Sequence, residues 1–273
     1  MKRLHILLLL LPFLLTVLSV PASAQAKKLK MAKELKITGS KGSNGACVVW
    51  HPKLKLYYAA MAGNKDYPME VYDAKGTSLT GNTQKTNFDV RGLWYNPKSQ
   101  SIQTNGYNES GWGEYQLNEK GFPVSVKVLV SGRHQPDEQA VGFYDPKLNR
   151  MGFFSWDDGK VMFYKAEDGS ALSSVTLYLG VKDKKDMGAY SYENVSNSYT
   201  MNTIVFTGKK NAEVGLLNME KKQIELYSLA TGMVTKVFAL PAEAPIPTSF
   251  CFAYTNGMFW LFDKSNRKWI GYK

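Results

Sequence analysis

The feature that most constrains the fold is a unit that recurs along the chain. In residues 142–175, GFYDPKLNRMGFFSWDDGKVMFYKAEDGSALSSV, short apolar runs alternate with an Asp-Pro turn, an Asp-Asp-Gly turn and an Asp-Gly turn. The same order occurs in residues 48–79 and in residues 92–130. The runs are rich in Val, Phe, Tyr and Trp, which is typical of strands joined by hairpin turns and not of helices. The chain after Gly39 is therefore predicted to be all-β.

The spacing of these units predicts how the strands are grouped. An aromatic residue stands two positions before a proline in each unit: Trp50, Tyr95 and Tyr144 precede Pro52, Pro97 and Pro146. These prolines are 45 and 49 residues apart, and a period of roughly 40–50 residues with four strands per unit is typical of a β-propeller blade. We predict a single propeller of four-stranded antiparallel blades. A fourth unit begins near residue 189, and the count is five blades, or six if residues 233–240 belong to another unit.

The last unit, residues 249–273, contains only three strands. In a closed ring the missing outer strand can come from the N-terminal side, where ELKITG (residues 34–39) precedes the first complete unit. Closure of this kind removes exposed sheet edges. A pair of β-sandwiches is the competing architecture, because short strands and turns occur there too.

The segment FYDPKLNRMGFFSW resembles the inner-strand pattern of exported bacterial propellers of the WD40-like, YVTN and TolB-like kind. The Gly-His dipeptide of WD40 blades and a Tyr-Val-Thr-Asn run are absent. The resemblance therefore implies a propeller that binds its ligands through loops. It assigns no catalytic residue.

The N-terminal residues predict export. Lys2 and Arg3 precede an apolar run over residues 6–15, and Ala22-Ser23-Ala24 has the small-x-small pattern of a signal peptidase site. We therefore predict a signal peptide over residues 1–24, a propeller domain over residues 25–273, and a periplasmic or secreted protein. The apolar run is short for a membrane span, which needs roughly 20 residues, and no later segment approaches that length. No transmembrane segment is expected in the mature chain.

The chain is basic, with a formal net charge of +11, and several of the positive charges gather in KKLKMAKELK at residues 27–36. Removal of Lys2 and Arg3 with the signal peptide would lower the charge to +9. Such a balance favours an acidic polymer or an anionic membrane face, and it is equally compatible with a solvated basic surface. No nucleic acid is expected as a partner of an exported chain without an arginine-rich face.

Motifs of common catalytic machinery are absent from the sequence. It contains no G-x-S-x-G, no P-loop and no H-E-x-x-H. Only His51 and His134 remain after residue 24, and with two distant cysteines they make no recognisable zinc set. Asp157-Asp158-Gly159 lacks the spaced acids of an EF-hand and is interpreted as a hairpin turn. We expect no metal and no cofactor.

Five-bladed propellers also occur among glycosidases of the arabinanase and invertase groups, which leaves an enzymatic alternative. Such enzymes need two carboxylates across a sugar-sized gap. The acids near the starts of predicted inner strands are Asp89, Glu138 and Asp186. The alternative function is thus a glycan-active hydrolase or lyase with these three residues at the channel mouth.

The leading hypothesis is a non-enzymatic binding or scaffold propeller that recognises a glycan or a protein. In a propeller the loops at residues 62–68, 106–115, 131–139, 155–159 and 182–188 share one face. Aromatic rings beside planar hydrogen-bonding groups suit sugars or peptides. The candidate ligand-binding residues on these loops are Tyr67, Asn108, Trp112, Arg133, His134, Asp137 and Trp156. For Trp112 and Trp156, packing between blades is an equal alternative.

The two cysteines occupy matching places in the first and last units. Cys47 lies five residues before Pro52, and Cys251 lies five before Asn256, the corresponding turn residue. Because the first and last blades of a closed ring are neighbours, we predict a possible Cys47–Cys251 disulfide, which an oxidising compartment would permit. The alternative is that both are small buried hydrophobic residues.

Overall fold

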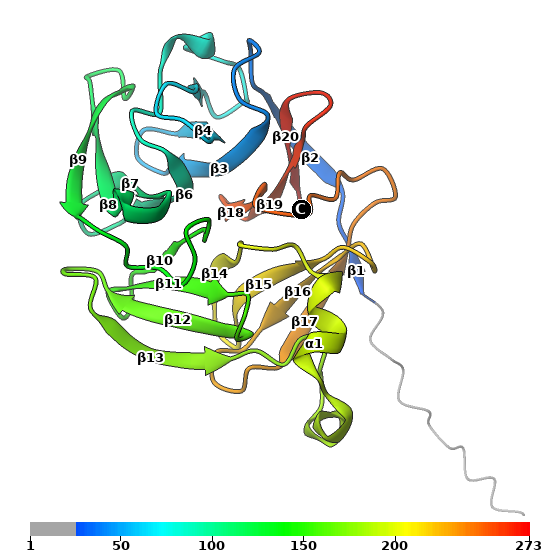
Figure 1. The fold of residues 1–273 in the computed structure, drawn as a ribbon. Coiled ribbons are helices and arrows are strands. Elements are labelled where there is room, and N and C mark those ends of the chain that lie inside the picture. Colours follow the sequence, from blue (N-terminus) through cyan, green and yellow to red (C-terminus); the bar gives the residue numbers. More distant parts are fainter. Residues whose placement is uncertain (1–25) are drawn as a thin grey trace, which may run out of the picture.

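The computed structural model describes residues 26–273, which form a five-bladed β-propeller (Figure 1). The predicted signal peptide, residues 1–24, lies outside the described residues. The innermost strands of the blades, β3, β6, β10, β14 and β18, contact one another around the central axis. The predictions of an all-β chain and of five propeller blades are confirmed.

The first three blades follow the chain order outward from the axis. Blade 1 contains β3 (Asn44–His51), β4 (Leu56–Ala62) and β5 (Met69–Tyr72). Blade 2 contains β6 (Val90–Asn96), β7 (Ser101–Gly106), β8 (Trp112–Leu117) and β9 (Pro123–Val130). Blade 3 contains β10 (Phe143–Asp145), β11 (Arg150–Ser155), β12 (Lys160–Lys165) and β13 (Ala171–Thr176).

The last two blades each include a strand from the N-terminal part of the chain. Blade 4 contains β14 (Val205–Lys209), β15 (Ala212–Asn218), β16 (Gln223–Tyr227), β17 (Val234–Ala239) and the short parallel strand β1 (Lys27–Lys28). Blade 5 contains β18 (Phe252–Thr255), β19 (Met258–Asp263), β20 (Lys268–Tyr272) and β2 (Met31–Lys36).

The ring is closed by the N-terminal strand, as the three-stranded final unit predicts. Strand β2 pairs antiparallel with β20, with Leu35 opposite Trp269 and Glu34 opposite Ile270. The apolar stretch at residues 233–240 forms β17, the outer antiparallel strand of blade 4, so there is no sixth blade. Two blades depart from four strands: blade 1 has three and blade 4 has five.

Short helices lie on the connections between strands. They are η1 (Gly81–Thr83), η2 (Asn108–Ser110), η3 (Lys184–Ala189), α1 (Tyr192–Val195) and η4 (Ser196–Ser198). The last three belong to the long connection between blades 3 and 4, which extends outward beside α1 (Figure 1). Within residues 26–273 no helix is both long and apolar enough to cross a membrane.

The blades pack face to face, and this packing buries the middle strands on both sides. Every residue of β4 is buried, because it is covered by blade 2 on one side and by blade 5 on the other. Blades 2 and 3 approach closely at Gly92: a Cβ atom there would lie 2.7 Å from the carbonyl oxygen of Gly142. Only glycine fits this contact.

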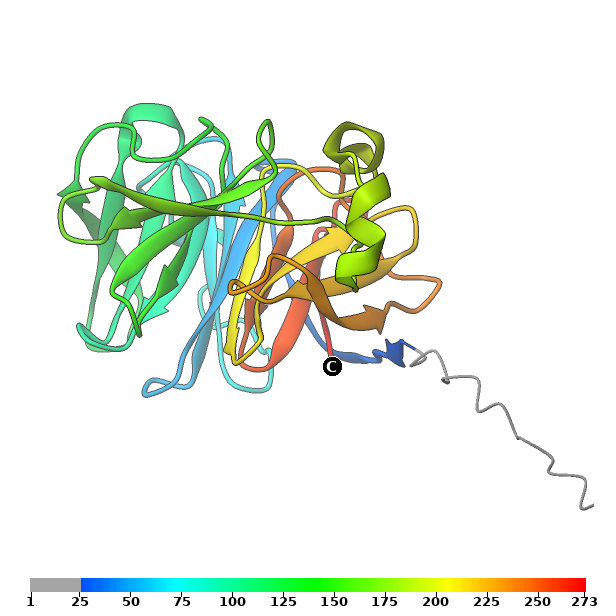
Figure 2. The ribbon, with the colours of Figure 1, turned by 90° about the horizontal axis from the view of Figure 1, so that it is seen from below.

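The connections divide between two faces of the ring, which Figure 2 shows from the side. We call one the loop face; it holds residues 63–68, 81–89, 107–111, 131–142, 156–159 and 177–203. We call the other the turn face; it holds the inner-strand turns at residues 52–55, 97–100, 146–149, 210–211 and 256–257.

Candidate functional site

At the centre of the loop face, a buried arginine connects several blade-joining segments. The Arg91 side chain is 6% exposed, and its Nη1 donates to Oδ1 of Asp89 at 2.7 Å. Its Nε donates to Oε1 of Gln139 at 2.8 Å. The guanidinium carbon lies 4.8 Å from the ring centroid of Tyr107 and 5.7 Å from that of Phe250. Arg91 therefore fixes this end of the channel by ion pairing, hydrogen bonding and cation–π contact.

Asp89 and Glu138, two of the three acids of the enzymatic alternative, both border Arg91. Oδ1 of Asp89 also accepts from the Gly63 amide at 3.0 Å. The Glu138 carboxylate lies close enough to the Tyr107 hydroxyl to raise the pKa of Tyr107 above its usual value. Backbone bonds hold the same segments together, because Tyr107 N donates to Asp89 O at 2.8 Å and Asn108 N donates to Glu138 O at 3.0 Å. We call Asp89, Arg91, Tyr107, Asn108 and Glu138 the Arg91 cluster.

Asp186 does not join this cluster. It is exposed in η3, on the connection between blades 3 and 4, and its backbone amide donates to Asp183 O at 3.1 Å. No hydrogen bond or ion pair within residues 26–273 links Asp186 to Asp89 or Glu138. The prediction of three acids at one channel mouth is therefore wrong for Asp186, because the long connection carries it outward.

Trp112 is buried between blades 2 and 3, in correction of the prediction that its ring faces a ligand. It is 2% exposed, and its ring is stacked on Phe153 with a centroid distance of 6.3 Å. His134 contacts it edge-on at 5.8 Å. Trp112 is the first residue of β8, so its side chain lies within the inter-blade core and not on the preceding loop.

His134 and Arg133 lie at the outer part of the same seam. Nδ1 of His134 is 3.0 Å from the Gly169 carbonyl oxygen and Nε2 is 2.9 Å from that of Ser131. Since both partners are acceptors, both bonds form when both ring nitrogens carry a hydrogen. His134 thus joins the loop after β9 to the β12–β13 turn, and Arg133 beside it is exposed.

The remaining predicted residues are half-buried and dispersed over the loop face. Tyr67 packs against the core of blade 1. Oδ1 of Asp137 accepts from the Gln139 amide at 2.7 Å. Trp156 contacts Tyr192 edge-on at 6.4 Å, at the connection between blades 3 and 4. Of the seven predicted ligand-binding residues, only Asn108 belongs to the Arg91 cluster, and Asp137 adjoins it.

Sequence reasoning did not single out Arg91, and one signal could have found it. Arg91 interrupts the apolar inner strand VRGLWY, and a charged residue in a buried strand needs a partner. In the described part of the chain, no group of three or more His, Cys, Asp or Glu side chains is arranged to hold a metal ion.

The predicted disulfide is not formed: Cys47 and Cys251 are both free and buried. The thiol of Cys251 does reach the closure seam, where Sγ donates to the Gly45 carbonyl at 3.2 Å. Sγ of Cys47 instead donates to Leu93 O at 3.5 Å, on blade 2. The Cys251 thiol therefore points to β3 itself, whereas the Cys47 thiol points away from blade 5, to β6. Burial raises the pKa of each thiol to about 11.

Comparison with known proteins supports the propeller fold and shows no family for the chain. No protein-family model matches the chain, and no curated protein sequence matches it. Among solved structures it is similar to the crystal structure of Myxococcus xanthus glutaminyl cyclase, with a TM-score of 0.51 and 9% sequence identity over 91% of this chain and 97% of that chain. At this identity the similarity shows the fold alone. The chain is a β-propeller protein, and the WD40-like, YVTN and TolB-like resemblance is confirmed only at the level of that fold.

Proposed function

We propose that this chain is an exported β-propeller that binds a glycan or a protein through its loop face and does not transform its ligand. The Arg91 cluster is the observation that carries the proposal. It combines an aromatic ring, two carboxylates and an amide side chain at the end of the central channel, on segments held together by the Arg91–Asp89 pair and by backbone hydrogen bonds. Rigid rings beside fixed polar groups suit the flat faces and hydroxyls of sugars, and also peptide groups.

The surroundings of the Asp89 and Glu138 carboxylates favour a binding function over hydrolysis. A glycosidase needs one carboxylic acid that protonates the leaving group and a second carboxylate across the scissile bond. Here the Asp89 oxygen is held by both Arg91 and the Gly63 amide, and Glu138 lies beside the Tyr107 hydroxyl. The Asp89 carboxylate is thus engaged by protein donors, which suits a preorganised polar surface.

Two substitutions test this surface. Tyr107→Ala and Glu138→Gln should each weaken binding to a glycan-array hit, or to a partner captured from the native envelope, by about tenfold or more, as central interface residues do. Glu119→Gln is the matched control, because Glu119 is exposed on the β8–β9 turn away from the loop face. Unchanged affinity in both cluster variants would remove the Arg91 cluster from the binding site.

The alternative function is a glycan-active hydrolase or lyase using Asp89 and Glu138. Its support is that Asp89 pairs with Arg91 while Glu138 precedes Gln139, which accepts from the same arginine, and that the similar solved structure is a glutaminyl cyclase, an enzyme on this fold. Purified protein should be screened against polysaccharides. Turnover that is lost in both Asp89→Asn and Glu138→Gln would replace the binding proposal with this alternative.

Export is part of the proposal and rests on residues 1–24 of the sequence. Cleavage after Ala24 would leave Gln25 as the first residue. N-terminal sequencing of the protein recovered from the periplasm or the medium tests this, and an intact N-terminus on cytoplasmic protein would contradict it.

A further inference from the structure

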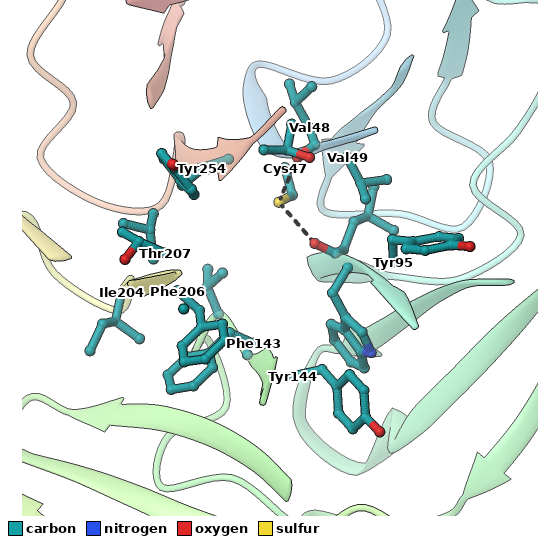
Figure 3. Close-up of a pocket in the computed structure, with 18 of the residues that line it drawn as sticks. Cys47, Val48, Val49, Tyr95, Phe143, Tyr144, Ile204, Phe206, Thr207 and Tyr254 are labelled. Atoms are coloured by element: carbon teal, nitrogen blue, oxygen red, sulfur yellow. Dashed lines mark hydrogen bonds between the residues drawn. The ribbon is translucent and has the colours of Figure 1, made fainter. Parts of the chain in front are cut away.

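The central channel contains a cavity of about 380 Å³ that opens on the turn face, opposite the Arg91 cluster (Figure 3). All five inner strands line it. Its deeper wall is apolar and buried, with Cys47, Val49 and Ile204. Nearer the mouth the half-buried rings of Tyr95, Phe206 and Tyr254 border it, and each also packs on a neighbouring ring, that of His51, Phe143 and Phe259 respectively. The volume lies within the range of small-molecule sites, roughly 300–1,000 Å³.

The lining residues define the direction in which the cavity opens. Pro97, Pro146 and Gly208, at or next to the inner-strand turns, contribute to it, whereas from the loop face only Val141 and Gly142, at the start of blade 3, do so. At the opposite end, Arg91 packs over Phe250. A ligand would therefore enter between the turns of the inner strands.

Three of these turns share one sequence pattern and one conformation. Each has a proline followed by a lysine, and the residue two positions after that lysine has a positive φ: Lys55 at 56°, Gln100 at 57° and Asn149 at 51°. The same turn repeated on blades 1, 2 and 3 places Lys53, Lys98 and Lys147 at equivalent positions around the cavity mouth. Blade 4 adds Lys209 and Lys210 at its own inner turn.

These five lysines are exposed, and none of them forms an ion pair in the described chain. The Lys209 ammonium lies 5.6 Å from the Tyr254 ring centroid at the mouth. Asp145, on one of the same hairpins, is neutralised by Arg150 at 3.1 Å. Lysines without an ion-pair partner thus stand on the inner turns of blades 1 to 4, next to the mouth of an aromatic cavity that no lysine lines directly.

We propose that this cavity binds a small aromatic carboxylate. The flat apolar body would pack against the rings of Tyr95, Phe206 and Tyr254, where offset and edge contacts favour aromatic partners. The carboxylate would remain at the mouth, within the field of the lysines, which attracts anions and repels cations. The site is separate from the loop face, so the inference does not depend on the proposed function.

Calorimetric titration with three probes of one shape tests both parts of the proposal. The probes are 2-naphthoate, neutral 2-naphthamide and the cation 2-naphthylmethylammonium. At low salt the naphthoate should bind about tenfold more tightly than the amide, since several exposed lysines each contribute modestly. The difference should shrink to about twofold at roughly 0.5 M salt, where charges are screened. The cation should bind most weakly.

Substitutions at the cavity mouth test whether the probes bind in this cavity. The triple variant K53Q/K98Q/K147Q should remove most of the preference for naphthoate over the amide, since only Lys209 and Lys210 remain, and should leave the amide unchanged. Tyr254→Ala should weaken both. K182Q/K184Q/K185Q removes three exposed lysines from the connection between blades 3 and 4 and is the charge-matched control. Equal affinity for all three probes, no binding of naphthoate, or equal losses in the two lysine triples would overturn the proposal.

Discussion

Replacing Glu70 tests how the N-terminal segment is fastened where the ring closes. Glu70 is 0% exposed on β5 of blade 1. Its Oε2 accepts from the Thr38 amide at 2.8 Å, and its Oε1 accepts from the Thr38 hydroxyl at 3.2 Å and the Ser78 hydroxyl at 2.7 Å. Thr38 follows closing strand β2, so one carboxylate ties blade 1 to the segment that completes blade 5.

The size of the effect follows from these three bonds. A donor that loses its buried acceptor costs about 1 to 3 kcal/mol, but the two hydroxyls can turn toward other partners. Glu70→Ala should therefore destabilise the protein by about 3 to 4 kcal/mol, which corresponds to a fall in Tm of about 6 to 16 °C in a domain of this size. Glu70→Gln can keep its carbonyl oxygen on the Thr38 amide and present its NH₂ group to the hydroxyls. It should lose only about 1 to 2 kcal/mol.

Urea unfolding followed by tryptophan fluorescence measures both variants. Glu34→Gln and Glu34→Ala are the controls, because Glu34 lies on β2 itself and pairs with Lys268 at 2.6 Å with 41% of its side chain exposed. Such an exposed pair contributes less than about 1 kcal/mol. If Glu70→Ala were no more destabilising than Glu34→Ala, the carboxylate would not fasten the closure.

Further experiments test the packing between blades and the state of the two cysteines. Trp112→Ala should lower the free energy of unfolding by about 3 to 5 kcal/mol. Trp112→Phe should lower it less, because the buried Nε1 has no hydrogen-bond partner within residues 26–273. Equal losses for the two variants in chemical denaturation would contradict this packing. Gly92→Ala should lower the free energy of unfolding by about 3 kcal/mol, because the added Cβ forces blades 2 and 3 apart. Gly188→Ala is the control: no atom lies within 4 Å of its added Cβ, and its free energy of unfolding should stay within about 0.5 kcal/mol of wild type. Protein unfolded without reductant should show two alkylated thiols by intact mass, and a disulfide would leave neither Cys47 nor Cys251 labelled. Because folding raises both thiol pKa values from 9.0 to about 11, it favours the protonated form, so stability should fall as pH rises from about 9 to about 11. This slope should be smaller in the Cys47→Ala/Cys251→Ala variant.

The blade architecture could be predicted from sequence because its signals are local. Strand periodicity and the repeated turn at Pro52, Pro97 and Pro146 recur within each unit. Closure by an N-terminal strand followed from the count of strands in the last unit, since an unpaired edge is unfavourable. The number of strands differs from four in two blades: blade 1 completes its interface with three strands, and β1 adds a fifth to blade 4.

The candidate site could be predicted only in part. Asp89 and Glu138 were found from their places before inner strands, but Arg91, which binds Asp89 and Gln139, was hidden inside an apolar run. Trp112 follows the loop in sequence, yet its alternation along β8 directs it into the core. The cysteines occupy matching places in the sequence repeat, but Cys47 lies within β3 whereas Cys251 precedes β18, and its thiol donates to the Gly45 carbonyl.

The sequence by itself determined that this chain forms short strands in repeated units and closes them into a ring, because hydrophobic alternation and turn residues act over a few positions. Tertiary structure alone decided which side chains meet. Asp89 and Glu138 are 49 residues apart, and Lys53, Lys98 and Lys147 belong to three different blades. Their separations depend on the twist of each blade and on how closely neighbouring blades pack around the axis, and no local pattern in the sequence encodes these quantities.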